Sequence, residues 1–480
     1  MSSGADLYRF GPFELDAAVP YLMRDGELVA LPIRHVLVLL RLVSDAPRLV
    51  VKNALVKAGW KQTFVNDESL TQVIKRLRDV LGRQPGDQPY IETLIGHGYR
   101  FVVPVERVTR RQPDVDLDTL LVPYLALVDG RAPLELLDLD MVARACEELP
   151  QALRQAPDNA TLHIALANAY ALRFESTRAD RAPDLGTLQK ALRHSREGRR
   201  LDAQSGEAWG TLAFVLHRCG MRRDAIAAAE KAIDLTPLEW RHYFRLGFVT
   251  WGAQRLNATC RVSRMWPGLA LNHLCAGMVF VARSRFEPAL DELRAGCVAQ
   301  NTQHEQMGPF NGVGLHWLHA LVLGAQGADD DALEGLAREL AFENPRHVYS
   351  RECCGNTWCA CGAIHLRNGR PDAAKAAFHE AQKRLPGHAL SGVGLAVLAG
   401  ASCAPAADQA ANSVEAAMVR SAFLAQTGDH HGAARMYTDA LAHAEPGSAG
   451  WLLPADPLIN ATAHLDAWQQ ALTLLRNRAA

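Results

Sequence analysis

The chain has 480 residues, 49% of them hydrophobic, which is enough for about three domains with packed cores. Its 51 basic and 52 acidic residues nearly cancel, and this balance excludes a polybasic coat of nucleic acid. The N-terminus lacks the pattern of a signal peptide, and no uncharged apolar run approaches the roughly 18 residues of a membrane span. We therefore expect a cytoplasmic protein without membrane contact, whose ten cysteines are reduced thiols.

The charge is spread unevenly along the chain. Residues 1–110 contain fifteen Lys and Arg against twelve Asp and Glu, a balance of +3, so the stated net charge of −1 leaves −4 for the remainder. A mildly basic first part on an acidic body can bind DNA locally, with modest affinity for non-specific sequences.

Short strands and then helices are predicted for the first sixty residues. Apolar residues alternate over 8–16, and Asp25-Gly26 separates two strand-like runs within 22–31, which indicates a hairpin. An apolar helical face follows Pro32 and ends near Asp45-Ala46-Pro47. A short apolar link at 49–51 then leads to a second helix over 52–58.

The helix predicted over 68–81 is the main candidate for binding. Its apolar residues Leu70, Ile74, Leu77 and Leu81 recur at spacings of four, three and four, which predicts one buried stripe. The other face carries short polar, amide and cationic side chains, which reach base edges and phosphates in a DNA groove. A solvated surface helix has the same composition, so the neighbouring elements must decide.

Those neighbours complete a winged helix. Strands predicted at 90–94 and 99–103 flank the glycine-rich tip Gly96-His97-Gly98. Motifs recur in order along this region. They are Phe10-Gly11 with Leu15-Asp16, Arg24-Asp25-Gly26 with Leu31, Leu49-Val50 through Leu55 to Trp60, Ser69-Leu70 with Ile74, Arg76-Leu77-Arg78 and Leu81-Gly82, Ile91-Glu92-Thr93, and Gly96-x-Gly98-Tyr99-Arg100-Phe101. With these elements and motifs, residues 7–104 resemble the OmpR/PhoB-type winged helix-turn-helix DNA-binding domain of bacterial transcriptional regulators.

The resemblance implies that 68–81 is the recognition helix and lies in the major groove. In the tip of the wing, Ile95 stands where many relatives have an arginine, so His97 or Arg100 would have to supply the minor-groove contact. Arg100 has a second interpretation, since it can instead brace the hairpin. The base-facing positions implied on the helix are Ser69, Gln72, Val73 and Arg76, and Lys75 and Arg78 are placed for phosphates.

The resemblance also implies partners. Promoter DNA is the first, and a dimer on DNA is one arrangement that we consider. The connector 61–67 corresponds to a loop that contacts RNA polymerase in related activators, which makes the polymerase a candidate partner.

The rest of the chain is Ala/Leu-rich and predicted to be helical, and it contains a repeat. Trp209, Leu212, Ala213, Leu216, Gly220, Ala225, Ala229, Ala232 and Pro237 have the same spacing as Trp358, Cys361, Gly362, His365, Gly369, Ala374, Phe378, Ala381 and Pro386. This spacing resembles the tetratricopeptide (TPR) pattern, with small residues where two antiparallel helices approach closely. About six to eight helix pairs are expected, with a capping helix at 461–476 and a loop near 402–407.

The predicted fold class is an α+β winged-helix head followed by an all-α, TPR-like solenoid, so the chain is mainly α overall. The expected boundaries are 1–106 for the head, 107–116 for a linker and 117–480 for the repeats. Solenoids of this kind present a concave groove, where we expect a protein or peptide partner.

No catalytic constellation, phosphate-binding loop or nucleophile elbow is found, so no enzyme activity and no cofactor are expected. The densest cluster of soft metal ligands is Cys353, Cys354, Cys359 and Cys361 with His347 and His365. Its spacing differs from a paired C-x2-C knuckle, and the repeat explains several members as core, so no metal is predicted. A metal or redox sensor there stays an open alternative.

Together these features favour a sequence-specific DNA-binding transcriptional regulator whose repeats receive a signal or partner, and we expect it to be an activator. The organisation resembles one-component regulators in which this domain precedes helical repeats, such as the invasion-gene activators of enteric bacteria. The alternative is an interaction scaffold that retains a degenerate winged helix for protein contacts.

Overall fold

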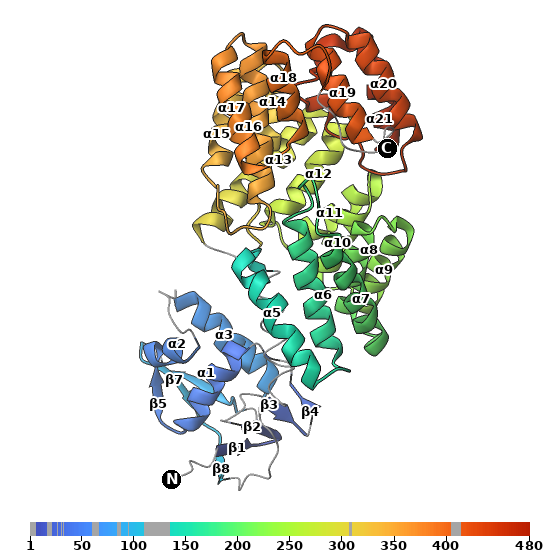
Figure 1. Ribbon diagram of the computed structural model, residues 1–480. Coiled ribbons are helices and arrows are strands. Elements are labelled where there is room, and N and C mark those ends of the chain that lie inside the picture. Colours follow the sequence, from blue (N-terminus) through green and yellow to red (C-terminus); the bar gives the residue numbers. More distant parts are fainter. Residues whose placement is uncertain are drawn as a thin grey trace. The chain divides into compact units, whose positions relative to one another are not determined.

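The computed structural model describes residues 6–16, 22–25, 27–29, 31, 33–59, 67–83, 88–94, 96–109, 135–306, 310–404 and 414–480. The chain divides into two units, Met1–Tyr124 and Leu125–Ala480. Figure 1 shows small strands with a few helices in the first unit, and helices throughout the described part of the second. The predicted fold class is therefore confirmed.

Two antiparallel sheets build the first unit. The larger sheet has the strand order β4-β3-β2-β1-β8, and the smaller has the order β5-β7-β6. Their bounds are β1 Asp6–Phe10, β2 Phe13–Asp16, β3 Leu22–Arg24, β4 Glu27–Leu28, β5 Leu49–Val51, β6 Ile91–Leu94, β7 Gly98–Phe101 and β8 Glu106–Thr109. Both predicted hairpins are present, since β3 pairs with β4 and β6 with β7.

Two strands differ from the sequence prediction. Residues Leu49–Val51 were predicted as a link, but they form β5, which pairs with β7. Strand β8 begins at the last residue of the predicted head, continues over the first three residues of the predicted linker 107–116, and pairs with β1. In both cases the partner strand is distant in sequence, and a short strand without its partner carries little signal of its own.

Three helices pack on these sheets. They are α1 Ile33–Ser44, α2 Lys52–Gly59 and α3 Asp67–Leu81. An aromatic cluster of Phe10, Phe13, Tyr90 and Phe101 joins the first hairpin to the last, with ring centroids 5.0 to 6.3 Å apart. Gly11 turns the chain between β1 and β2 at a φ of 58°, directly beside the Tyr90 hydroxyl.

The second unit is a stack of helix pairs. The pairs are α6 Ala160–Glu175 and α7 Leu185–Leu201, α8 Gly206–Arg218 and α9 Arg222–Leu235, α10 Trp240–Val249 and α11 Ala253–Met265, α12 Ala270–Ala282 and α13 Phe286–Glu305, α14 Leu315–Ala325 and α15 Asp329–Leu340, α16 Ser350–Arg367 and α17 Pro371–Arg384, and α19 Val414–Gln426 and α20 His430–His443. Helix α5, Leu139–Gln155, precedes them, and α18, Ala389–Leu398, precedes α19. The short helices η1, Leu453–Ala455, and η2, Ala461–His464, precede the last helix α21, Leu465–Arg478.

The small residues of the repeat lie where the pattern requires them. Ala213, Ala225 and Ala232 are fully buried in the pair α8/α9. In the pair α16/α17, a side chain added at Gly362 would meet the ring of Phe378. These positions set the close approach of the two helices in each pair, which confirms the predicted TPR-like packing.

The first helices of successive pairs contact one another, so they form an inner row. Two places along this row make contacts with distant parts of the same chain. The last helix α21 packs on α12, and Arg283 donates to the carbonyl oxygens of Ala479 (2.8 Å) and Ala480 (3.0 Å). A second contact joins the first helix pair to the sixth. Arg351, at the start of α16, donates to the carbonyl oxygen of Ser176, just after α6, at 2.7 Å. The predicted groove is therefore bridged by intramolecular contacts. Among the described residues, no helix has the length and apolar character needed to cross a bilayer.

Candidate nucleic-acid interface

Helix α3 separates cleanly into a buried and an exposed face. Its apolar residues Leu70, Ile74, Leu77 and Leu81 are at most 3% exposed, as the periodicity predicts. Arg78 in the last turn of the helix suits the negative end of the helix dipole. The exposed face consists of Thr71, Gln72, Lys75, Arg76 and Asp79.

Lys75 and Arg76 are the free cations of this face. Neither makes an ion pair or hydrogen bond within the part of the chain that the structure describes. Arg76 lies four residues after Gln72, so the two side chains share one side of the helix. A guanidinium and an amide next to each other offer bidentate donors and acceptors to base edges, whereas the Lys75 ammonium suits phosphates.

One residue of the predicted set belongs to the core. Val73 was assigned to the base-facing side, but its side chain is only 4% exposed and packs in the hydrophobic core of the head. Val73 follows Leu70 by three residues, so it widens the buried stripe. The structure thus gives Val73 a place in the core, and its contact with DNA stays a prediction. Thr71 takes an exposed place on this face that the sequence analysis overlooked, although its spacing of four from Lys75 would have indicated it.

Arg78 connects helix α3 to the hairpin of β6 and β7. Its Nε donates to the carbonyl oxygen of Ile91 at 3.0 Å, and its Nη2 donates to Thr93 Oγ1 at 2.6 Å. Both partners lie on β6. Arg78 therefore fixes the angle between helix α3 and the hairpin, and these two donors are not directed at phosphates.

The wing is formed by β6, β7 and the tip between them. Gly98 has a φ of 151° and lies so close to β5 that an added side chain would collide with the carbonyl oxygen of Val50. His97 is exposed at the tip. Arg100 pairs with Glu92 across the hairpin at 2.6 Å, as in the bracing interpretation of this residue.

The remaining predicted positions stand as follows. Ser69 lies in the first turn of α3, and its side chain is outside the described residues. Ile95 and the connector 61–66 are also outside them. The structure therefore brings together Gln72, Lys75 and Arg76 on one face, with His97 on the neighbouring wing and Arg78 between helix and wing.

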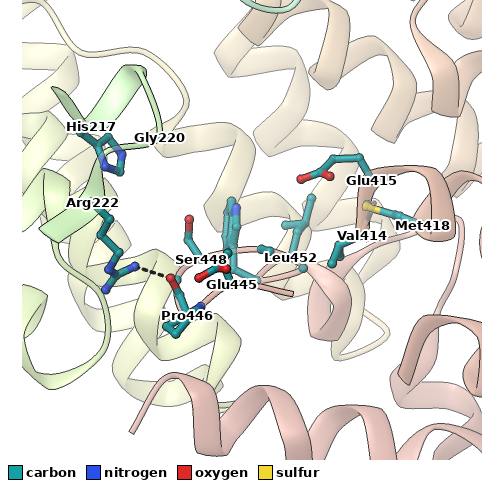
Figure 2. A pocket seen from close by; sticks show the side chains of 14 residues that line it. His217, Gly220, Arg222, Val414, Glu415, Met418, Glu445, Pro446, Ser448 and Leu452 are labelled. Carbon is teal, nitrogen blue, oxygen red and sulfur yellow. Dashed lines mark hydrogen bonds between the residues drawn. The ribbon is translucent and has the colours of Figure 1, made fainter. Parts of the chain in front are cut away.

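A second candidate site is a hollow in the repeat unit (Figure 2). It has a volume of about 880 Å³ and opens between the α8–α9 turn, the start of α19 and the loop 445–452. Arg222 reaches across from α9 and donates to the carbonyl oxygen of Pro446 at 2.8 Å. Glu415 and Met418 line the opposite wall. Apolar surface with a few charged groups is typical of sites for peptides and small ligands.

The cysteine cluster offers no such site. All four thiols lie on α16, where Cys354, Cys359 and Cys361 are buried. Burial raises the pKa of Cys361 to about 12 and that of Cys354 to about 11, which opposes formation of the reactive thiolate. Within the described residues, no three His, Cys, Asp or Glu side chains converge to hold a metal ion.

Comparisons with known proteins agree with this geometry. Residues 26–101 match the family model described as "Transcriptional regulatory protein, C terminal". The transcriptional regulator HilA of Salmonella typhi is 39% identical over 101 residues, which cover 21% of this chain and 18% of HilA. The sensory transduction protein RegX3 of Mycolicibacterium smegmatis is 27% identical over 102 residues, which cover 21% of this chain and 45% of that protein. The chain thus spans less than a fifth of HilA.

Solved structures show weaker likeness. The DNA-binding domain of E. coli CadC aligns with 21% of this chain and 96% of its own, at 26% identity and a TM-score of 0.20. Human IFIT1 in its dimer with m7Gppp-AAAA aligns with 67% of this chain and 72% of its own, at 16% identity and a TM-score of 0.46. The family match and the observed elements together identify an OmpR/PhoB-type transcriptional-regulator domain at the N-terminus, followed by a TPR-like helical-repeat domain.

Proposed function

We propose that this chain is a sequence-specific DNA-binding transcriptional regulator without catalytic activity. The observation that carries the proposal is the exposed face of α3, which presents Gln72, Lys75 and Arg76. The opposite face of the same helix is buried in the core and holds these side chains in place. A rigid helix with free polar and cationic side chains fits the major groove of DNA. The family match over 26–101 supports the same function.

Each residue of the face has a proposed part. Arg76 reads a guanine through its O6 and N7 acceptors, and Gln72 reads an adenine at a neighbouring step. Lys75 contacts a phosphate. His97 follows the backbone beside the minor groove, while Arg78 and Arg100 hold the wing in place.

The test is DNA binding by the full chain. Genomic fragments are first selected for binding, and affinity for the recovered site is then measured for Arg76→Ala and for a control, Arg9→Ala. Arg9 is an exposed arginine on β1 that pairs with Glu14. It lies in the larger sheet of the same unit, whereas Arg76 lies on helix α3. Arg76→Ala should weaken binding about 5- to 150-fold and relax one base position, while the control binds as the wild type does.

A different result would support the scaffold alternative. If Arg76→Ala and the wild type bind every fragment equally, the face of α3 does not read DNA. The winged helix would then serve protein contacts.

We further propose that the regulator activates transcription and that RNA polymerase is one of its partners. The resemblance to activators of this organisation supports this, as does the position of the connector 61–67 before the recognition helix. A dimer on DNA is proposed in addition. Transcription in vitro from a bound promoter should rise with the protein, and the mass of the complex on DNA gives the number of chains.

The partner of the repeat domain is proposed to bind in the hollow beside the loop 445–452, because the inner row itself is bridged. Met418→Glu would place a charge on the wall of this hollow. Regulation in cells should be lost while binding of purified protein to DNA is kept. A variant that regulates normally would exclude this site.

A further inference from the structure

Helix α7 carries an unusual concentration of positive charge. Over Leu185–Leu201 it holds five basic residues, Lys190, Arg193, Arg196, Arg199 and Arg200, against one acid, Glu197. The chain as a whole has a net charge of −1, and residues beyond 110 carry the acidic excess. This helix is therefore opposite in sign to the domain that contains it.

Three of these five cations have partners within the domain. Arg200 pairs with Glu197 at 2.7 Å. The guanidinium of Arg199 lies 5.2 Å from the centre of the Trp209 ring, and the Lys190 ammonium lies 5.6 Å from the centre of the Tyr170 ring. The ring contacts orient Arg199 and Lys190 but do not neutralise their positive charge. Only the charge of Arg200 is compensated, by Glu197.

Arg193 and Arg196 are exposed and make no ion pair or hydrogen bond to any residue in the described ranges. They follow Lys190 at spacings of three residues, and Arg200 comes four residues later, so the series lies along one side of the helix. Its length from 190 to 200 is about 15 Å, which matches roughly four base-pair steps of B-DNA.

The shape of this surface also suits a polyanion. A shallow hollow of about 630 Å³ runs along α7, and four arginines outnumber one acid in its lining. Apart from two histidines, the lining residues are Gln189, Leu192, Arg193, Arg196, Glu197, Arg199 and Arg200. Beneath it, the buried rings of His163 and His194 hydrogen-bond to each other through their Nδ1 atoms at 3.0 Å. The histidines fill the floor, and the positive charge of the lining comes from its four arginines.

The exposed residues of α7 distinguish nucleic acid from a protein partner. Past Leu185 at its first position, the exposed side chains are Gln189, Lys190, Arg193, Arg196 and Arg200. A stable protein interface needs a central group of apolar or aromatic anchors, and beyond Leu185, which lies at the end of the helix, this face has none among its exposed side chains. Contacts with a phosphate backbone need only positive charge and hydrogen-bond donors.

We propose that the cationic face of α7, residues Lys190, Arg193, Arg196 and Arg200, binds DNA phosphates that flank the site held by the winged helix. This inference rests on the proposed function of the head. The head benefits from such a contact because α3 carries three acidic residues against three basic ones. One polypeptide joins the two sites, so DNA bound at the first is presented to the second at high effective concentration.

The experiment uses the full chain and two DNA duplexes. The shorter contains only the site selected by the head, and the longer adds flanks of about 30 base pairs on each side, enough to extend past a few helical turns. Affinity is measured by fluorescence anisotropy from about 50 to 200 mM salt. The test variant is Arg193→Gln with Arg196→Gln. The matched control is Arg144→Gln with Arg338→Gln, two exposed arginines elsewhere in the repeat domain.

The test variant should bind the longer duplex about 10-fold more weakly than the control, with a salt slope lower by up to about two, since each lost phosphate contact removes about 0.9. On the shorter duplex the two variants should bind equally. Thermal unfolding should also be equal, because all four side chains are exposed.

Equal binding of the longer duplex by test and control variants would overturn the proposal. If Arg76→Ala still abolishes binding in that case, the proposed function of the head survives and only the role of α7 is excluded. If the test variant loses regulation in cells with DNA binding intact, α7 serves an acidic protein instead, which also overturns the proposal.

Discussion

The guanidinium of Arg78, on helix α3, donates to the hydroxyl of Thr93, on strand β6, at 2.6 Å, and it also donates to the carbonyl oxygen of Ile91. One side chain thereby spans the two elements that would enter neighbouring grooves of DNA. The sequence analysis placed Arg78 at a phosphate. The geometry shows that Arg78 ties helix α3 to strand β6, and its contact with a phosphate stays a prediction.

Replacing Arg78 with lysine separates the two roles. Lys keeps the positive charge but lacks the fork that bonds Ile91 and Thr93 together. We expect Arg78→Lys to weaken binding to the selected DNA site several-fold with an unchanged salt slope, because the wing loses its fixed angle. Affinity as a function of salt measures both quantities. A lysine variant that binds as the wild type does, with Arg78→Ala losing about one unit of slope, would restore the phosphate role.

Val73 gives a second contrast between stability and recognition. Its side chain is 4% exposed in the core of the head, so Val73→Ala removes two buried methyl groups. We expect this change to lower the stability of the head by about 1–2.5 kcal/mol, measured by urea unfolding monitored in the first unit. The preferred base at each position of the DNA site should stay the same. A change of base preference at one position, without loss of stability, would place Val73 in the groove after all.

The elements of the head were predictable because their signals are local. The stripe from Leu70 to Leu81 and the glycine tip at 96–98 each contain their own periodicity or turn residues. Strand β5 could not be recognised in the same way, since its three residues acquire meaning only from pairing with β7. Val73 was ambiguous because it borders both faces of the helix, and packing against the core decides between them.

In the repeat domain, the buried small residues were predictable from the sequence. The contacts that join distant helix pairs were not. The spacing of the repeat fixes which helices pair. It does not indicate that Arg283 holds the carbonyl oxygens of Ala479 and Ala480, or that Arg351 reaches Ser176. Those contacts join segments far apart in the chain. The sequence around a single arginine does not indicate which distant carbonyl oxygen it will bind.

Gly362 tests the packing of the repeat. An added Cβ would lie 2.6 Å from the ring of Phe378, which on its other side contacts Gly394 of α18. We expect Gly362→Ala to destabilise the repeat domain by about 1–3 kcal/mol through overpacking, despite the better helix propensity of alanine. Gly186→Ala on α7 is the control, since its nearest neighbour is the side chain of Asp184 at 3.4 Å. Equal melting temperatures for both variants would show that α17 can shift to admit the methyl group.

The last prediction concerns acid. Burial lowers the pKa of His347 to about 4, and those of His194, His242 and His316 similarly. In His347, Nε2 donates to the carbonyl oxygen of Asn311 at 2.8 Å, and Nδ1 accepts from the backbone N–H of Tyr349 at 3.2 Å. Protonation of Nδ1 would remove that acceptor inside the fold.

The sign of the effect follows from these values. An unfolded histidine binds its proton near pH 6.5, so between about pH 6.5 and 4 the unfolded chain holds more protons than the folded one. Stability must fall as the pH is lowered through this range, by up to about 3 kcal/mol for each such histidine. Burial raises the pKa of Asp456 to about 6 and also raises that of Glu352, and hydrogen bonds to Glu292 and Pro267 keep the pKa of His273 raised against its desolvation. These three groups work in the opposite direction over part of the range.

Urea unfolding of the repeat domain at a series of pH values checks this prediction. His347→Gln keeps a donor and an acceptor but cannot be protonated, so it should reduce the loss of stability between pH 6.5 and 4. His431→Gln is the control, because its side chain is 66% exposed. If the two variants lose stability with the same dependence on pH, the buried His347 is not among the groups that take up protons on unfolding.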